Sequence, residues 1–385
     1  MRVLHLVKTA VGAKWALSQM RELIALGVEV HVALPQGPML EQYIQADIKV
    51  HHMQPGVSLH PTRLLQRCRQ LRRLVTMIQP DLIHSHFVTS SLLMRLALRD
   101  MPIPRVFQVP GPLHLEHPLF RRLELISANQ HDHWLASCQW TRNCYRQEGI
   151  DERRLGLAYY GTQPALFADD SGSTPKLKQT LGMTEKDLLI GMVAYFYAPK
   201  RYLGQTRGLK GHEDLIDALV LIRRRYPTAR CVFVGGPWAG ADNYFDKVRA
   251  YARQKVGGAA IFLGTRTDIG ALYRQIDLAV HPSHSENVGG AVESLLARVP
   301  TVTTNVGGFP DLILNGQTGW LCQPRDAPSL AEKIIQAWQQ PAQRVHIVEQ
   351  GYARASELMD VRRNASDVNQ FYRQILSQVQ EGRRL

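Results

Sequence analysis

Short apolar runs alternate with helix-length amphipathic segments along nearly the whole chain, and this rhythm restricts the fold more than any other feature. In the first half, seven strand-like runs begin with Val3–Val7 and end with Leu155–Tyr160, and helical patterns such as Pro61–Ile78 separate them. Apolar runs joined by helices are typical of a parallel sheet covered on both faces. The sequence therefore predicts an α/β fold built on doubly wound parallel sheets.

The rhythm stops once and then restarts. Residues 168–175, ADDSGSTP, are polar and rich in turn formers, which indicates a linker. We therefore expect an N-terminal Rossmann-like domain (1–165), a linker (166–180), a C-terminal Rossmann-like domain (181–360) and a final helix (361–385) that packs back on the first domain. Two such domains would face each other across a cleft, with ligands at the carboxyl ends of the strands.

Net charge and cysteine content indicate which partners and which cellular compartment suit the protein. The 385 residues carry 46 Lys and Arg against 33 Asp and Glu, a net charge of +13. This excess favours anionic partners such as nucleotides, nucleic acid or an anionic membrane surface. Five scattered cysteines without a C-x-x-C pair indicate neither a disulfide framework nor a zinc site. With no signal-like or membrane-spanning apolar run, we expect a cytoplasmic protein, either free or bound to the inner face of the plasma membrane.

The segment AVHPSHSENVGGAVESLLA, residues 279–297, carries the strongest chemical signal. A strand ends before a loop with Glu286, and Gly289 and Gly290 open a helix that contains Glu293. The N–H groups at a helix N-terminus bind phosphate, and glycines there let the ligand approach the backbone closely. Two nearby carboxylates can accept hydrogen bonds from hydroxyl groups. The pattern indicates a sugar nucleotide. The alternative is structural, with Glu286 as a helix cap and Glu293 facing solvent.

A second signal is LKGHEDLI, residues 209–216, in which Lys210 precedes a helix. A lysine there is well placed for a diphosphate, although a solvated lysine would give the same pattern. Three further strand ends run into glycine-containing loops, at 232–236, 262–268 and 303–310. Each of these alone indicates only a turn.

Taken together, these segments resemble a known family. RVLHLV, PDLIHSH, LIGMVA, LKGHEDLI, CVFVGG, FLGTRTDI, YRQIDLAVHPSHSENVGGAVESLLARVPTV and NVGGFPDLILNGQTGWL are similar, in order and spacing, to retaining glycosyltransferases of family 4 with the GT-B fold. The resemblance implies an enzyme of the bacterial cell-surface polysaccharide type. It would move a sugar from a UDP- or GDP-sugar to a hydroxyl of a glycan or lipid-linked saccharide. No cofactor and no metal are expected.

The resemblance also implies roles for matching residues. Glu293 would hold the ribose hydroxyls, Glu286 the donor-sugar hydroxyls and Lys210 the diphosphate, where a nearby arginine and helix N-termini would help to stabilise the leaving charge. The remaining donor-binding positions are Gly12, Tyr195, Gly235, Thr265, Arg266, Asn287, Val288, Gly289 and Gly290.

The chain departs from the family pattern at several positions. Six residues rather than seven separate the two glutamates, and one glycine, Gly12, stands in the first loop where two are common. Tyr195 replaces a usual arginine, so Arg201 or Arg207 would supply the cation. Pro110 occupies a usual histidine position, which leaves His114 or Glu116 as the replacement.

The acceptor is expected on the N-terminal domain, where His84 and His86 end a strand and Glu116 lies nearby. The basic helix at 61–78, together with Arg121 and Arg122, indicates either a membrane-surface patch or a solvated basic face. Two other classes stay open: a sugar-nucleotide epimerase with the same fold, and a basic nucleic-acid-binding protein. The second lacks a recognisable nucleic-acid-binding motif, so no nucleic acid is expected as a partner.

Overall fold

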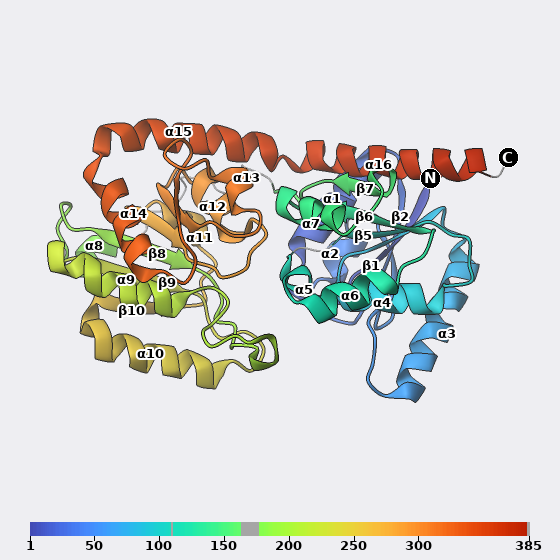
Figure 1. Cartoon of the computed structure of the whole chain (residues 1–385), viewed down its shortest axis with the longest axis horizontal. Helices are drawn as coiled ribbons and strands as arrows, with labels where there is room; N and C mark the ends of the chain where they lie inside the picture. Colours follow the sequence, from blue (N-terminus) through green and yellow to red (C-terminus); the bar gives the residue numbers. More distant parts are fainter. Residues whose placement is uncertain (109–110, 163–176, 383–385) are drawn as a thin grey trace. The chain divides into compact units, whose positions relative to one another are not determined.

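The structure is a computed structural model that describes residues 1–108, 111–162 and 177–382. The chain divides into two compact units, Met1–Gln163 with Met359–Leu385, and Pro164–Leu358. Each unit contains one parallel sheet with helices on its faces (Figure 1). The predicted α/β, doubly wound fold is therefore confirmed for both halves of the chain.

The first unit holds a seven-stranded parallel sheet in the order β3-β2-β1-β4-β5-β6-β7. Its inner strand β1 is mostly apolar and almost wholly buried, as a strand covered on both faces requires. The strands are β1 (Arg2–Leu6), β2 (Glu29–Leu34), β3 (Lys49–His52), β4 (Leu82–Ser85), β5 (Arg105–Gln108), β6 (Asp132–Ala136) and β7 (Leu155–Leu157).

The last helix of the chain closes the core of this unit. It is strongly amphipathic, and its buried Phe371, Tyr372 and Ile375 join the core that also contains Val3 and Leu17. It lies beside α1 (Figure 1). The helices of the unit are α1 (Lys14–Ala25), α2 (Leu40–Ile44), α3 (Pro61–Ile78), α4 (Val88–Ala97), α5 (Leu113–Glu116), α6 (Pro118–Ile126), α7 (Gln139–Gln147) and α16 (Val361–Gly382).

The second unit holds a six-stranded parallel sheet in the order β10-β9-β8-β11-β12-β13. Strand order reverses between β8 and β11, which is the topological switch point where doubly wound sheets bind ligands. The strands are β8 (Leu189–Val193), β9 (Arg230–Val234), β10 (Ala260–Gly264), β11 (Leu278–His281), β12 (Thr301–Thr304) and β13 (Trp320–Cys322).

Helices cover both faces of this second sheet (Figure 1). They are α8 (Leu177–Thr180), α9 (His212–Arg225), α10 (Asp242–Val256), α11 (Ile269–Tyr273), α12 (Gly289–Leu296), α13 (Phe309–Leu312), α14 (Ala327–Gln339) and α15 (Pro341–Leu358). Among the described residues, short 3₁₀ segments lie within the first unit, at η1 (Glu152–Arg154), and within the second, at η3 (Arg201–Leu203) and η4 (Gly257–Ala259).

The structure differs from the sequence pattern in two details. Strand β13 is only three residues long and stands outside the predicted strand-like runs. Residues 177–180, which the pattern places in the linker, form α8, and Lys178 anchors it through an ion pair with Asp277 at 2.9 Å. The polar stretch 168–175 and Pro110 lie outside the described residues.

Candidate functional site

The loops that follow β8 and β11 meet at the switch point of the second sheet. Gly211 ends the first loop with a φ of +74°, and a Cβ atom there would collide with the backbone carbonyl of Pro282. Glycine is therefore required for this close approach. It brings Lys210 next to Glu286, which lies 76 residues further along the chain.

Lys210 and Glu286 form an ion pair in a partly buried setting, with side chains 19% and 11% exposed. The backbone N–H of Asn287 donates a hydrogen bond of 3.1 Å to Glu286 Oε1. The ammonium group lies 5.9 Å from the ring centre of Tyr197. Burial lowers the pKa of Lys210, but the attraction of the Glu286 carboxylate raises it by more. The pKa of Lys210 therefore lies above its ordinary value. The cation is therefore permanently charged and held in place.

The N-terminus of α12 adjoins this pair. Gly289 has a φ of +28°, and a Cβ atom there would press against the Glu286 carboxylate. Asn287 is 5% exposed, and its amide oxygen has no hydrogen-bond partner in the described part of the chain. Free N–H groups of a helix start, a lysine and an unpartnered amide together suit a ligand that carries both phosphate and hydroxyl groups.

Glu293 lies one turn further along α12, and its carboxylate has no hydrogen-bond partner among the described residues. Burial raises the pKa of Glu293 to about 7. A largely buried carboxylate that accepts no hydrogen bond lowers the stability of the folded protein. Hydroxyl groups of a bound ligand could donate the hydrogen bonds that Glu293 lacks.

We expect Glu293→Gln to stabilise the empty protein in a pH-dependent way. The pKa of Glu293 is raised from 4.5 to about 7 on folding, so its contribution to the free energy of unfolding falls as pH rises between these values. The limit is about 1.4 kcal/mol per pH unit. The stability gain of the variant over the native protein should therefore grow from pH 5 to pH 7 and then stay constant. Urea unfolding at pH 5, 6, 7 and 8 measures it.

The matched control is Glu332→Gln on α14, whose side chain is 72% exposed. Its stability difference from the native protein should not change with pH over this range. A gain for Glu293→Gln that is equally independent of pH would contradict the raised pKa.

Arg207 does not join the Lys210–Glu286 pair. Its guanidinium pairs with Asp214 at 2.5 Å and with Asp217 at 2.8 Å, both on α9, and His284 also bonds Asp214. These pairs tie the loop before Lys210 to α9, and through His284 to the loop after β11. The role of Arg207 as the replacement cation stays a prediction.

The other predicted donor residues of this unit lie at the carboxyl ends of neighbouring strands. Tyr195 follows β8, is 40% exposed and meets Trp238 edge-on, with ring centres 5.0 Å apart. Gly235 follows β9, and its N–H donates to the carbonyl of Gly264 at 2.8 Å. Thr265 and Arg266 follow β10 and are exposed, and Arg266 pairs with Asp268 at 2.7 Å. Val288 and Gly290 flank the start of α12.

The structure places the predicted acceptor histidines in the interior of the first unit. His84 and His86 have no exposed surface, and their rings contact each other and His5. His84 Nδ1 lies 2.5 Å from the hydroxyl of Tyr372 on α16. Burial lowers the pKa of both rings well below the ordinary value. An acceptor-binding role for these two residues is therefore corrected, because neither ring reaches the surface.

The two residues offered as replacements at the Pro110 position differ in exposure. His114 is 7% exposed, with Nε2 at 3.2 Å from the Tyr145 hydroxyl, and burial lowers its pKa to about 4. It is thus a neutral imidazole at pH 7. Glu116 is exposed at the end of α5, and Gly12 is exposed in the loop after β1.

His5, His84 and His86 are also a set of side chains that could hold a metal ion, with candidate ligand atoms within 4.8 Å of one another. His5 Nδ1 and His86 Nε2 already share a hydrogen bond of 2.9 Å, and His86 Nδ1 lies 3.2 Å from the Tyr160 hydroxyl. Each ring thus has one or two protein partners, while His5 Nε2 and His84 Nε2 have none among the described residues. The expectation that no metal is needed stays a prediction.

Sequence reasoning missed Tyr197, Asp214 and His284 as parts of the site. Asp214 and His284 stand in segments already recognised, LKGHEDLI and AVHPSHSEN, and Tyr197 follows the segment LIGMVA by three residues, but nothing in these segments says which side chains come together. Asp214 follows Lys210 by four residues on the predicted helix. Its partners come from other loops, and only the fold brings them together.

Comparisons with known proteins match both units of the chain. The family described as Glycosyltransferase Family 4 matches residues 13–165, and the family described as Glycosyl transferases group 1 matches residues 201–354. Glycogen synthase of Mycobacterium tuberculosis is 36% identical over 144 residues, which cover 37% of this chain and 34% of that protein. The chain thus spans about a third of the length of that relative.

Other relatives extend further. EpsD of Bacillus subtilis, named as a glycosyltransferase, is 24% identical over 82% of this chain and 81% of its own. The lipopolysaccharide core biosynthesis mannosyltransferase LpcC of Rhizobium leguminosarum is 26% identical over 46% of this chain and 52% of its own.

A solved structure of HepE from Anabaena, in complex with UDP, shares the fold over 96% of this chain and 99% of that one, with 23% identity and a TM-score of 0.79. Another structure of that protein contains UDP-glucose. The two domain matches fall one in each unit, and each unit has the parallel sheet described above. The chain belongs to the family 4 glycosyltransferases with a group 1 C-terminal domain, enzymes of the GT-B fold.

Proposed function

We propose that the protein is a retaining glycosyltransferase that moves a sugar from a nucleotide diphosphate sugar, such as a UDP- or GDP-sugar, to a hydroxyl of a glycan or lipid-linked saccharide in bacterial polysaccharide biosynthesis. One observation carries the proposal. Lys210 and Glu286 are paired at the start of α12, beside an unpartnered Asn287 oxygen and an unpartnered Glu293 carboxylate. The UDP and UDP-glucose complexes of HepE support a nucleotide-sugar donor.

Each group then has a chemical task. The Glu293 carboxylate accepts hydrogen bonds from the ribose hydroxyls, which supply the donors that it lacks in the empty protein. The N–H groups at the start of α12 bind phosphate oxygens. When the donor binds, the Lys210 ammonium group pairs with the diphosphate in place of Glu286. The Glu286 carboxylate is then free to accept hydrogen bonds from hydroxyls of the donor sugar.

The reaction breaks the bond between the sugar and the diphosphate while an acceptor hydroxyl attacks on the same face, and the hydroxyl proton passes to the departing phosphate oxygen. Negative charge grows on the departing phosphate oxygen, so stabilisation there lowers the barrier most. Lys210 and the helix start supply it. Because these groups supply positive charge at the departing phosphate, we propose that transfer needs no metal.

Nucleotide binding is the direct test. Thermal unfolding of the full chain with UDP, GDP and ADP, and with their sugars, should show one series that raises the midpoint. Ligand at about 100 times its Kd adds roughly 2.7 kcal/mol of stability. Glu293→Ala should weaken that shift, and Glu332→Ala should not, because Glu332 is an exposed residue on α14.

No shift with any nucleotide would contradict the proposal. Conversion of the donor sugar without transfer to any acceptor would favour an epimerase. Binding of duplex DNA without any response to nucleotides would favour the nucleic-acid alternative.

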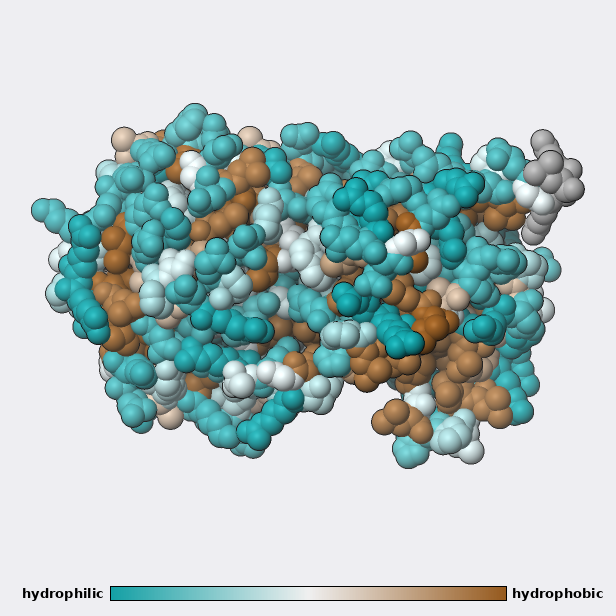
Figure 2. All heavy atoms as spheres, in the orientation of Figure 1, coloured by the Kyte–Doolittle hydropathy of each residue, from teal (hydrophilic) through white to brown (hydrophobic). Residues whose placement is uncertain are grey.

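A surface of the first unit supports the proposed membrane partner. Leu119, Leu123 and Ile126 of α6 are 57%, 47% and 63% exposed, and their spacing places them on one face of the helix. Figure 2 shows hydrophobic atoms gathered over α4 and α6. Arg122 is exposed on the same helix. We propose that this face lies on an anionic membrane on the cytoplasmic side.

The basic helix α3 contributes fewer free charges than its sequence implies. Arg67 donates to the carbonyl of Gly56 at 2.7 Å, and Arg72 pairs with Asp100 at 2.5 Å. Other arginines of the helix stay exposed, namely Arg63, Arg69 and Arg73. No helix among the described residues is long and apolar enough to cross a bilayer, so any contact made by these described helices is at the surface.

We expect the full chain to sediment with vesicles that contain phosphatidylglycerol and not with vesicles of phosphatidylcholine alone. Raised salt should weaken the binding, since the charge contribution is screened. Leu119→Ser with Leu123→Ser should reduce it several-fold, whereas Leu314→Ser, a 37%-exposed leucine of the second unit, should not. Equal binding to both vesicle types, or no effect of the double variant, would remove α6 as the contact.

A further inference from the structure

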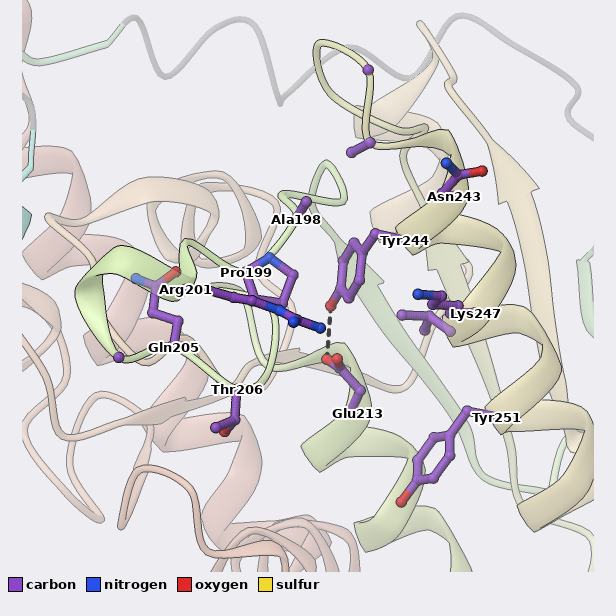
Figure 3. Close-up of a pocket in the computed structure, with 14 residues that line it drawn as sticks. Ala198, Pro199, Arg201, Gln205, Thr206, Glu213, Asn243, Tyr244, Lys247 and Tyr251 are labelled. Carbon is purple, nitrogen blue, oxygen red and sulfur yellow. Dashed lines mark hydrogen bonds between the residues drawn. The ribbon is translucent and has the colours of Figure 1, made fainter.

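A cavity of about 820 Å³ lies between residues 198–206, the first turn of α9 and helix α10 (Figure 3). Its volume is in the range of small-molecule sites. Lys210, Glu286 and Glu293 are not among its lining residues, so it is separate from the donor site described above. Most of its lining comes from the long loop after β8 and from α10, and Glu213 of α9 completes it.

The unbalanced charge in this cavity is positive. Arg201 enters from the loop and Lys247 from α10, and Figure 3 shows both pointing into the space beside Tyr244. Among the described residues, neither has a hydrogen-bond or carboxylate partner. The one acidic side chain of the lining, Glu213, is already used, since it accepts hydrogen bonds from the Tyr244 hydroxyl at 2.8 Å and from the Gly208 N–H at 3.3 Å.

The rest of the lining combines fixed aromatic rings with uncharged polar groups. The hydroxyl of Tyr244 is held by Glu213, and that of Tyr251 by Asp217 at 2.5 Å, so the two ring positions are set in advance. Asn243 and Thr206 add groups that can both donate and accept hydrogen bonds. Aromatic walls with a few polar groups suit a sugar ring, which has apolar C–H faces and an edge of hydroxyls.

The cavity and the donor site share one loop. Phe196 anchors the start of the loop, because its N–H donates to the Gly236 carbonyl at 3.0 Å and its own carbonyl accepts from Trp238. The Leu209 carbonyl accepts from the His284 N–H at 2.8 Å and anchors the end. Residues 198–206 line the cavity, whereas Tyr197 and Lys210, just beyond them on either side, lie at Glu286.

We propose that this cavity binds an anionic saccharide, a sugar that carries a phosphate or a carboxylate, and that its occupancy positions Lys210 for the donor. Arg201 and Lys247 bind the anionic group through charge-assisted hydrogen bonds. The sugar ring packs on Tyr244. The bound ligand fixes the loop between its two anchors, and this raises the affinity of the protein for the donor. Bound donor raises the affinity of the cavity for the anionic saccharide by the same factor. This second part rests on the proposed function.

Calorimetry with the full chain saturated with UDP tests the cavity, with four probes: glucose 6-phosphate, glucuronate, glucose and inorganic phosphate. We expect an anionic sugar to bind at least tenfold more tightly than glucose or phosphate, and the phosphate and carboxylate arms identify which anionic group is preferred. Arg201→Ala with Lys247→Ala should weaken binding at least tenfold. Arg253→Ala, an exposed arginine of α10 outside the cavity, should leave it unchanged.

The donor coupling is measured by titrating UDP into the full chain with and without the anionic sugar. UDP affinity should rise several-fold when the cavity is filled, in the native protein and not in the double variant. Displacement of the anionic sugar by UDP, unchanged binding in the double variant, or no binding of either anionic sugar would overturn the cavity site. Unchanged UDP affinity would overturn the coupling. If UDP does not bind, the same titrations are made with the nucleotide that raises the unfolding midpoint. If no nucleotide binds, the proposed function fails, and the effect of the double variant on sugar binding still decides the cavity.

Discussion

Lys210→Ala should lower kcat about 10²- to 10³-fold, because it removes the fixed cation that meets the growing charge on the diphosphate. The effect on KM for the donor should be smaller, since the helix start and Glu293 still bind the nucleotide. Lys210→Arg should recover part of the rate because it keeps the charge. Initial rates with the donor identified by nucleotide binding measure both.

Two controls separate chemistry from folding. Lys186→Ala removes an exposed lysine of the same unit and should not change kcat. Removing Lys210 leaves the Glu286 carboxylate without its cation, so the unfolding midpoint of each variant must be compared with the native value. Near-normal turnover of a folded Lys210→Ala protein would rule out the proposed role.

The largest stability effect is expected at Arg95 in the first unit. Arg95 pairs with Glu124 at 2.8 Å and with Asp132 at 3.2 Å, and all three side chains are at most 1% exposed. Arg105 adds a second pair with Asp132 at 3.0 Å. Arg95→Met leaves two buried carboxylates with less compensation, which typically costs about 3–5 kcal/mol. Urea unfolding measures the cost, and hydrogen exchange at the amides of β5 and β6 assigns it to this unit.

A surface pair of the same kind is the control for Arg95. Arg298 and Glu349 are 3.0 Å apart with side chains about half exposed, so Arg298→Met should cost about 1 kcal/mol or less. Adding Glu124→Leu to Arg95→Met should restore part of the loss, because it removes one of the stranded charges. A cost for Arg95→Met no larger than that for Arg298→Met would refute the importance of burial here.

The periodicity of the sequence was sufficient to predict the two sheets and most of the donor segment. Buried parallel strands must be apolar throughout, and their connecting helices must be amphipathic, so both leave a repeating pattern. Glu286, Gly289 and Glu293 belong to one continuous strand-loop-helix segment. Their proximity therefore follows from local geometry.

Contacts between distant segments could not be predicted in this way. Arg207, Lys210 and His284 all lie on loops at the switch point, but only the fold decides that Arg207 turns to Asp214 while Lys210 turns to Glu286. The α16 helix places Tyr372 against His84, and so identifies that histidine as interior. A histidine at a strand end looks the same in sequence whether it faces solvent or a later helix.

The sequence by itself thus determined the fold class, the order of elements and the residues of the local donor motif, because these depend on periodicity and short-range spacing. Only the tertiary structure decided the partners of each charged side chain, the cavity beside α10 and the exposed apolar face of α6. Those depend on which elements the fold packs together and which faces it leaves uncovered, and the free energy of burying or pairing a side chain is set by neighbours that are far away in the chain.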